Sequence, residues 1–265
     1  MTKDRVHSMT DNNQSTVSVA LHIAPEMAET DAAVRLREQF HTDAAENGLS
    51  LRLDREGLTL CFDGQELRGD FSHLLPRLKG LGGEFLVKAA KIKNAEGPLT
   101  AIDATAGLGE DSFFLAAAGF HVTMYERNPV IYALLRDALE RAARDPRLSD
   151  IAGRMTAIRG DSVVAMTQAA PAPDVVLLDP MFPARQKSAL VKKKLQMIQK
   201  LEFPCNDESE LLRAAMEAGP RKLIIKRPPK GPYLAGIKPD HSIEGKAVRF
   251  DCIVSPRDRI HKFFD

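Results

Sequence analysis

The 265-residue sequence contains no tryptophan and only three cysteines, Cys61, Cys205 and Cys252. These cysteines are far apart and form no C-x-x-C pair, so we expect neither a disulfide framework nor a zinc site. The sequence has no run of 18 apolar residues, which argues against a membrane-spanning helix. Its polar amino terminus lacks the apolar core of a secretory signal. These absences predict a cytoplasmic protein with no metal and no membrane partner, and they leave the oligomeric state open.

Strong net charge is also absent, because the formal net charge is +1. The distribution is uneven, however. Residues 183–265 contain 18 Lys and Arg against 10 Asp and Glu, a net of +8, whereas residues 1–182 carry a net of −7. A basic carboxyl-terminal third suits contacts with nucleic-acid phosphates, although a charged stretch is more often only a solvated face.

Hydrophobic patterning predicts three regions. Residues 1–17 are polar and irregular, and we expect a disordered tail there. Residues 18–80 predict a small α+β cap, with strands near 17–23, 49–54 and 58–62 and a helix over 31–47. Residues 81–265 predict the main domain.

In the main domain, strand and helix patterns alternate. This alternation predicts an α/β fold, with a doubly wound, mainly parallel, Rossmann-like sheet. The helix over 129–144 is the clearest, since Asn128 can cap it and Pro129 suits its first position. The expected strands are 99–103, 121–126, 154–158, 174–178, 222–226 and 247–254, and the other expected helices are 84–93, 112–119, 162–169 and 211–218.

Acidic side chains stand at the carboxyl ends of four of these strands. They are Asp103, Glu126, Asp161 and Asp179. Ligands of doubly wound sheets bind outside the carboxyl ends of the strands. We therefore expect these four carboxylates to line one site.

A glycine turn follows the first strand of the main domain, and Gly107 and Gly109 allow a ligand to approach its backbone closely. The third glycine of a nicotinamide-binding G-x-G-x-x-G motif is missing, because Ser112 takes its place. Asp103 and Asp111 would repel a pyrophosphate but attract an ammonium group. The loop therefore favours S-adenosylmethionine (SAM), which carries no phosphate, over a nicotinamide cofactor.

The next two strand ends predict the rest of the cofactor site. Glu126 is placed to accept hydrogen bonds from ribose hydroxyls. Arg127 would line the adenine side. Asp161 could accept a hydrogen bond from the adenine amine beside Ser162, although a helix N-cap is an equally simple explanation of Asp161 alone.

The fourth strand runs into Asp179-Pro180-Met181-Phe182-Pro183. In this pattern, Asp179 and the Pro180 carbonyl can accept hydrogen bonds from an amine on a planar ring, and Phe182 can stack on the ring. Beside a cofactor loop, the pattern predicts methyl transfer to the amino group of a nucleobase. Whether Asp179 also removes a proton is left open.

Basic residues follow the proposed pocket and the fifth strand. Both groups are predicted to contact phosphates of the nucleic-acid substrate, although the first could be solvated surface and the second a simple strand end. These residues are Arg185, Lys187, Lys192, Lys193, Lys226 and Arg227.

These motifs resemble the bacterial ribosomal RNA small subunit methyltransferase J family. The resemblance covers residues 82–254 and rests on IDATAGLGEDSFFLAAAG, ERNP, LLDPMFPARQKSALVKKK and IIKRP, with GGEFLVKAAKIK before them and VRFD after them. It implies a class I methyltransferase that uses SAM to methylate N2 of a guanine in small-subunit ribosomal RNA, free or within the 30S subunit. The family's cofactor positions would fall on Glu110-Asp111, Glu126-Arg127, Asp161-Ser162 and Asp179. Glu110 departs from the family pattern, where a basic residue is common.

Three alternatives stay open at this stage. The enzyme could methylate another amino group, in DNA, in a different ribosomal guanine or in a protein glutamine. The chain could also be a non-catalytic RNA-binding assembly factor that keeps the fold. A nicotinamide-dependent oxidoreductase is the third, and the missing third glycine counts against it.

Overall fold

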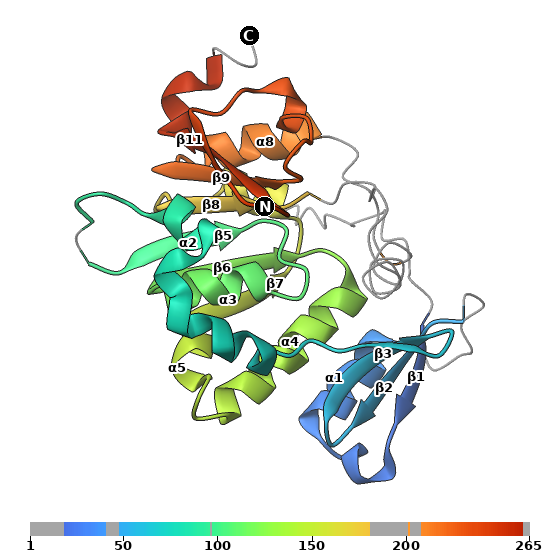
Figure 1. The fold of residues 1–265 in the computed structure, drawn as a ribbon. Helices are drawn as coiled ribbons and strands as arrows, with labels where there is room; N and C mark the ends of the chain where they lie inside the picture. The colour runs from blue at the N-terminus through green and yellow to red at the C-terminus, as the bar shows by residue number, and fades with distance from the viewer. Residues whose placement is uncertain (1–18, 41–47, 96, 181–200, 202–207, 262–265) are drawn as a thin grey trace, which may run out of the picture.

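The computed structural model describes residues 19–40, 48–95, 97–180, 201 and 208–261 (Figure 1). The predicted tail at residues 1–17 lies outside this part of the chain. The described residues form a four-stranded sheet near the amino terminus and a seven-stranded sheet in the remainder.

The larger sheet has the strand order β10-β11-β9-β8-β5-β6-β7. All of its pairings are parallel except those of β11, which runs antiparallel to both β9 and β10. The strand order reverses between β5 and β8, so this junction is the topological switch point of the sheet. The predicted mainly parallel α/β sheet is confirmed. Its strands are β5 (Leu99–Asp103), β6 (Phe120–Glu126), β7 (Met155–Arg159), β8 (Val175–Leu178), β9 (Lys222–Arg227), β10 (His241–Glu244) and β11 (Arg249–Val254).

Helices cover both faces of this sheet and make a three-layer domain (Figure 1). Successive side chains of a strand point to opposite faces of the sheet, so each strand contributes to the hydrophobic cores on both faces. On β8, Val175 and Leu177 pack on one face and Val176 and Leu178 on the other. One face carries α2 (Phe85–Ala90), α3 (Glu110–Ala117), α4 (Pro129–Arg144) and α5 (Ser149–Ala152), and the other carries α6 (Ser162–Thr167) and α8 (Glu208–Glu217).

The long helix α4 begins and ends where the sequence predicts. The Asn128 side chain accepts hydrogen bonds from the backbone N–H groups of Val130 and Ile131, and Pro129 occupies the first helical position. The side-chain oxygen thus satisfies two N–H groups that have no partner within the helix. This confirms the predicted cap.

The smaller sheet has the order β1-β2-β3-β4, with β1 parallel to β2 and the other pairs antiparallel. Its helix α1 is shorter than the predicted 31–47. It ends at Gln39 because Phe40 turns to extended backbone and buries its ring in the core of this unit. Residues 41–47 lie outside the described residues. The elements are β1 (Ala20–Ile23), η1 (Pro25–Met27), α1 (Asp31–Gln39), β2 (Ser50–Asp54), β3 (Gly57–Phe62) and β4 (Gln65–Leu67).

The amino-terminal unit packs on α4 of the main domain (Figure 1). Leu51, Leu58 and Leu60 of the small sheet share one hydrophobic cluster with Val130 and Leu134 of α4. Burial of apolar surface at this junction therefore stabilises both units together.

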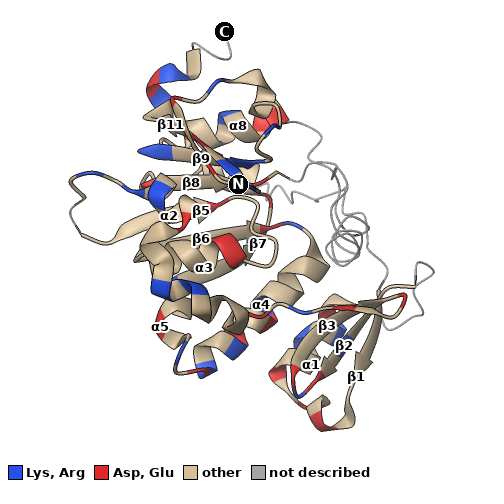
Figure 2. Ribbon diagram, viewed as in Figure 1, with Lys and Arg blue, Asp and Glu red and all other residues tan. Residues whose placement is uncertain are grey.

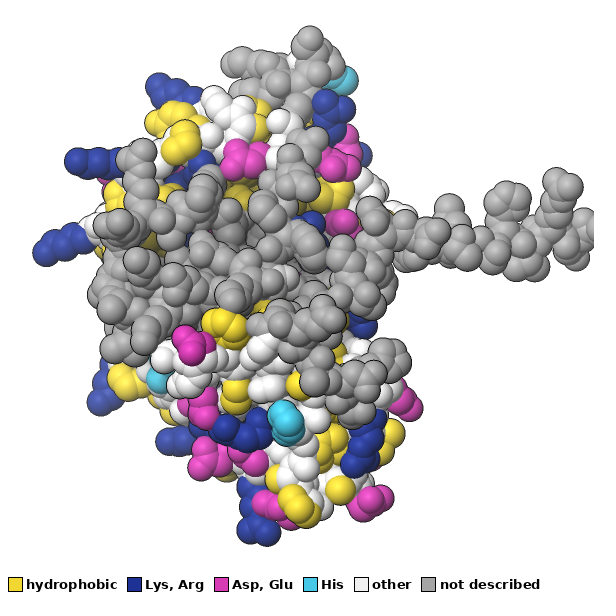
Figure 3. Space-filling model, turned by 90° about the vertical axis from the view of Figure 1, so that its right-hand side faces the viewer, with side chains coloured by type: hydrophobic (Ala, Val, Ile, Leu, Met, Phe, Trp, Pro, Cys, Tyr) yellow, Lys and Arg dark blue, Asp and Glu magenta, His cyan; other side chains and the backbone are white. Residues whose placement is uncertain are grey.

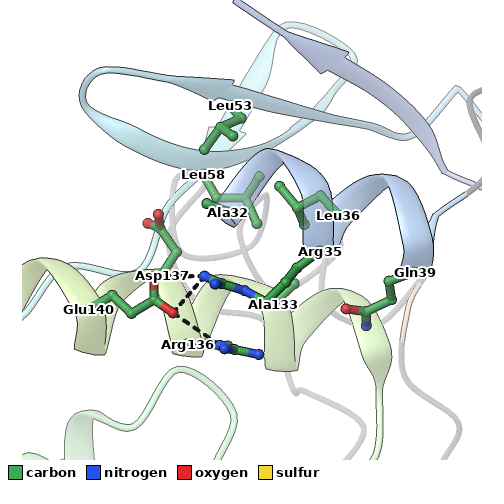
Figure 4. Close-up of a pocket in the computed structure, with 10 residues that line it drawn as sticks. All are labelled: Ala32, Arg35, Leu36, Gln39, Leu53, Leu58, Ala133, Arg136, Asp137 and Glu140. Carbon is green, nitrogen blue, oxygen red and sulfur yellow. Dashed lines mark hydrogen bonds and ion pairs between the residues drawn. The ribbon is translucent and has the colours of Figure 1, made fainter. Parts of the chain in front are cut away.

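Two ion pairs line one side of a small pocket at the edge of this junction (Figure 4). The pocket lies between α1 and α4, and Arg35 of α1 contacts Glu140 of α4 at 2.7 Å. Arg136 contacts the same carboxylate at 3.0 Å. These side chains are about one-third exposed or more, so the ion pairs add less to stability than the apolar contacts beneath them.

The structure also contains short elements that the sequence pattern does not predict. The 3-10 segment η2 (Ser72–Gly83) crosses the predicted domain boundary at residues 80–81, which stays a prediction. The others are β4, β10, α5, η1, η3 (Leu234–Gly236) and η4 (Pro256–Arg259). None of the described helices combines the length and the hydropathy needed to cross a bilayer.

Replacement of Gly69 by alanine tests the junction. A Cβ atom at Gly69 would lie 2.9 Å from the Ala138 Cβ and 3.1 Å from the Leu134 carbonyl oxygen of α4. Because both contacts involve a packed helix, we expect Gly69→Ala to lower the free energy of unfolding by about 1–3 kcal/mol in urea titrations. Gly80→Ala is the matched control, since a Cβ there meets nothing within 4 Å. Equal stability of the two variants would contradict the proposed close contact.

Candidate active site

The predicted acidic residues gather at the carboxyl edge of the large sheet. Asp103 ends β5, Glu126 ends β6, and Asp179 directly follows β8. Asp161 comes two residues after β7. Because these strands are parallel neighbours, their ends meet along one edge, and β5 and β8 flank the switch point.

Thr105 joins the glycine loop to the Asp179-Pro180 motif. The Asp179 N–H donates to the Thr105 hydroxyl at 2.6 Å, and the Ala104 N–H donates to the Leu177 carbonyl at 3.0 Å. Thr105 and Gly107 are only two residues apart, so the Asp179 nitrogen lies within about 12 Å of Gly107. One bound ligand can therefore contact both motifs.

The glycine loop turns sharply at two positive-φ residues. Gly107 has φ +55°, and its N–H donates to Glu126 at 3.1 Å. A Cβ at Gly107 would meet nothing within 4 Å, so its outer side is open to a ligand. Gly109 has φ +79°, and a Cβ there would lie 2.8 Å from Leu135. Gly107 thus faces the site, while Gly109 seats the loop on the core.

Asp103 supports the loop from below. Its side chain is 2% exposed and accepts hydrogen bonds from the Ser112 hydroxyl at 2.6 Å and the Thr105 N–H at 3.1 Å. Burial raises the pKa of Asp103 to about 7, and the Ser112 hydrogen bond opposes this rise. We expected Asp103 to hold an ammonium group directly. Its burial gives that expectation no support.

Glu126 connects the second strand to the loop. It is 8% exposed, and its carboxylate accepts hydrogen bonds from the N–H groups of Gly107 and Asn128. Burial raises its pKa, against the effect of these hydrogen bonds. A carboxylate has about four acceptor positions, so the predicted contacts with ribose hydroxyls remain compatible with this geometry. Arg127 beside it is exposed.

Asp161 caps α6, which is the equally simple explanation of this residue. Its side chain accepts a hydrogen bond from the Val163 N–H at 2.8 Å. Asp161 is exposed and Ser162 partly buried at the adjoining strand end. Their predicted contact with adenine stays a prediction.

Lys226 lies between two carboxylates of the site. Its Nζ atom is 2.5 Å from Asp111 Oδ2 and 2.9 Å from Asp179 Oδ2. Asp111 belongs to the first turn of α3, and Lys226 stands near the carboxyl end of β9, where Figure 2 shows basic residues. Burial among the strand ends raises the pKa of Asp179, and the Lys226 ammonium opposes the rise. Lys226 was predicted to contact RNA phosphates, but in this structure it pairs with site carboxylates.

Arg227 points to the opposite face of the sheet from Lys226. It is 2% exposed, its Nε donates to the Pro232 carbonyl at 2.8 Å, and its guanidinium lies 3.8 Å from Glu208 of α8. A buried guanidinium cannot reach a surface phosphate, so the predicted RNA contact of Arg227 has no support here. Its position instead suits fixing the loop after β9.

A second buried arginine holds the same loop. Arg249 donates to the carbonyl oxygens of Pro229 and Gly231 and forms a 2.8 Å ion pair with Asp251. Its guanidinium also lies 5.1 Å from the centre of the Tyr233 ring. These contacts hold the loop beside the end of β9, close to Lys226.

Several predicted site residues fall outside the described residues. They are Phe182, Arg185, Lys187, Lys192 and Lys193, and their roles stay predictions. Pro180 is described and buried, and exposed Glu110 lies 3.5 Å from His73. On the face shown in Figure 3, basic and acidic side chains of the described residues are mixed. The described residues contain no group of three or more His, Cys, Asp or Glu placed to hold a metal.

Comparison with known proteins identifies the family. A family model for SAM-dependent methyltransferases matches residues 37–255. Ribosomal RNA small subunit methyltransferase J of Marinobacter nauticus is 41% identical over 213 residues, or 77% of each chain. The protein of the same name from Thioalkalivibrio sulfidiphilus is 42% identical over 257 residues, or 86% of this chain and 100% of that one. The chain belongs to the ribosomal RNA small subunit methyltransferase J family.

A solved structure supports the assignment of the fold. A SAM-dependent methyltransferase of Neisseria gonorrhoeae superposes with a TM-score of 0.72 at 29% identity, covering 89% of this chain and 96% of that chain. The predicted class I methyltransferase fold and SAM as the cofactor are therefore confirmed. The nicotinamide-dependent alternative is excluded by the same family assignment.

The residues present fit SAM. The open side of Gly107 leaves room for a ligand against the loop backbone, and Glu126 accepts a hydrogen bond from the Gly107 N–H. The carboxylates of Asp111 and Asp179 lie together on Lys226 at the same edge of the sheet. Carboxylates suit the positively charged ammonium and sulfonium groups of this cofactor and would repel a phosphate. The predicted cofactor roles of these side chains are consistent with this arrangement and stay proposals.

Asp103 should make stability depend on pH. Its pKa is 3.8 when unfolded and about 7 when folded, so between these values the folded state binds more protons. The contribution of Asp103 to the free energy of unfolding is therefore fully present below pH 3.8. It falls by on the order of 4 kcal/mol as the pH rises to about 7. Urea unfolding from pH 4.5 to 8 should show Asp103→Asn gaining stability relative to the wild type as pH rises.

The Ser112 hydroxyl provides an internal check on this effect. The Ser112 hydrogen bond favours ionised Asp103, so Ser112→Ala should raise the pKa of Asp103 in the folded state. The loss of stability with rising pH should then extend to a higher pH. A stability difference between wild type and Asp103→Asn that stays constant with pH would disprove the assignment.

Proposed function

We propose that this enzyme transfers the methyl group of SAM to the exocyclic N2 amine of a guanine in small-subunit ribosomal RNA. The observation that carries the proposal is the Asp179-Pro180 motif, held against the glycine loop by the 2.6 Å hydrogen bond to Thr105. The names of the relatives from Marinobacter nauticus and Thioalkalivibrio sulfidiphilus support RNA of the small subunit as the substrate.

The chemistry requires help from the pocket because an exocyclic guanine amine is a weak nucleophile. Its lone pair is delocalised into the ring. Hydrogen bonds from the amine to the Asp179 carboxylate and to the Pro180 carbonyl oxygen would draw the lone pair out of the ring. In the reaction a nitrogen–carbon bond forms, a sulfur–carbon bond breaks, and the nitrogen releases one proton. When bound, SAM supplies the electrophilic methyl group on a positively charged sulfur.

The fixed position of Asp179 accounts for much of the expected rate. The Asp179 backbone is bound to Thr105, and its side chain is bound to Lys226 at 2.9 Å. A carboxylate held in place before the substrate arrives needs little reorganisation during the reaction. A paired or stacked guanine would first have to be turned out of the RNA, at a cost of a few kcal/mol.

Asp179→Asn tests this function directly. We expect at least about a hundredfold loss of kcat, because an amide cannot provide the negative charge that stabilises the amine as it loses electron density. Cofactor affinity should change much less. The assay is transfer of labelled methyl groups to small subunits from cells that lack the enzyme, with mass spectrometry of the nucleosides.

Asp174→Asn is the matched control, at the other end of the same strand. Asp174 stands before β8 at the opposite edge of the sheet and accepts a hydrogen bond from the Thr100 N–H at 2.9 Å. The Asp174→Asn variant should therefore have a kcat close to that of the wild type. A product other than N2-methylguanosine, or labelling of DNA or protein in place of the small subunit, would overturn the proposal, as would full activity of Asp179→Asn.

A further inference from the structure

Lys226 does not lie where its sequence position suggests. It follows an apolar run and is adjacent to Arg227, in a pattern typical of a surface phosphate contact. In the structure its side chain is 29% exposed and its ammonium contacts Asp111 and Asp179. Each of these acidic residues belongs to a different part of the proposed site.

Strand alternation explains this position. On β9, Lys222, Ile224 and Lys226 share one face, and Ile224 packs in the core that includes α3. Asp179 shares its face with Leu177, which packs in that same core. Lys226 is therefore directed at the start of α3 and at Asp179.

The two carboxylates need a cation between them. The 2.5 and 2.9 Å contacts, laid end to end, place the Asp111 and Asp179 oxygens no more than about 5.4 Å apart. Two carboxylates at such a distance repel each other, and each makes ionisation of the other harder. The Lys226 ammonium carries three donors and can bind both oxygens at once.

We propose that Lys226 is a positioning residue for methyl transfer, whose ammonium keeps Asp179 ionised and fixes it relative to Asp111 and the start of α3. The proposal rests on the function proposed above and deepens it. The Lys226 ammonium binds one carboxylate oxygen of Asp179. The second oxygen can still accept a hydrogen bond from the substrate amine. Asp179 then acts as a fixed hydrogen-bond acceptor.

The pH dependence follows from the charges around Asp179. Asp111 of α3 and Asp103 of β5 disfavour its ionisation, and Lys226 and Arg227 of β9 favour it. An opposite charge at this distance lowers the pKa of a carboxyl by about one to three pH units. Without Lys226, the Asp179 carboxyl should therefore protonate at a higher pH, and substrate binding through its ionised form should be lost there.

The test compares Lys226→Met with Lys226→Arg. In profiles of kcat/KM against pH, Lys226→Met should move the acidic limb upward by about one to three pH units and lower kcat at neutral pH by tenfold or more. Lys226→Arg should restore the position of the limb because it keeps the charge. Wild-type pH dependence in Lys226→Met would overturn the proposal, as would a limb in Lys226→Arg displaced as far as that of Lys226→Met.

Lys222→Met is the matched control. Lys222 lies on the same face of β9, four residues earlier, where its ammonium donates to the carbonyl oxygens of Ala89 and Lys91. Its loss should lower stability without moving the acidic limb. A shift in Lys222→Met equal to that in Lys226→Met would show that the effect is structural and would refute a specific role.

A measurement without RNA tests the role of Lys226 independently of the proposed RNA substrate. Carboxyl NMR titration of the protein, with the Asp179 signal assigned through Asp179→Asn, should give a higher pKa for Asp179 in Lys226→Met than in the wild type. This result would hold even if small-subunit RNA were not methylated. An unchanged pKa of Asp179 in a folded Lys226→Met variant would refute the proposal, whatever the substrate of the enzyme.

Discussion

The parallel pairing of β5 with β8 is the constraint on which the site depends. Asp103 pairs in register with Leu177, so the residues that follow the two strands emerge side by side at the switch point. Two hydrogen bonds extend this pairing past the strands, from Ala104 to Leu177 and from Asp179 to Thr105. The glycine loop and the Asp179-Pro180 motif, about 70 residues apart in sequence, are thereby held in one place before any ligand binds.

Alternation along the strands then sorts the charges at this edge. Asp103, Asp179 and Lys226 all lie on the face of the sheet that α3 covers, while Arg227 lies on the face that α8 covers. Two adjacent basic residues consequently have different environments. Lys226 enters the acidic site, whereas Arg227 is buried against Glu208 and the loop after β9.

The sequence predicts the main features of the domain because its signals are local. The strand 99–103 and the helix 129–144 match the structure residue for residue, since a glycine turn ends the first and Asn128-Pro129 begins the second. The acidic residues at the strand ends are also predicted, because each ends its strand or closely follows it in the sequence. The pairing of Lys226 with Asp111 joins residues 115 positions apart and depends on which face each strand residue takes. In a strand buried on both faces, apolar runs do not mark that choice, so the burial of Arg227 is missed as well.

The amino-terminal unit also bears on the site, through Asn128. The Asn128 N–H donates to Glu126 at the end of β6, its side-chain oxygen caps α4, and its side-chain amide donates to the Leu201 carbonyl. Leu201 is buried in the cluster that α4 shares with the small sheet. Leu201 is therefore held by the core that the two units share and, through Asn128, is connected to the end of β6. Because α4 and the small sheet form one core, a change that weakens their packing would also disturb Asn128, which caps α4 and donates to Glu126. This connection gives the amino-terminal unit a physical route to the candidate site, although none of the residues that line the pocket between α1 and α4 belongs to that site.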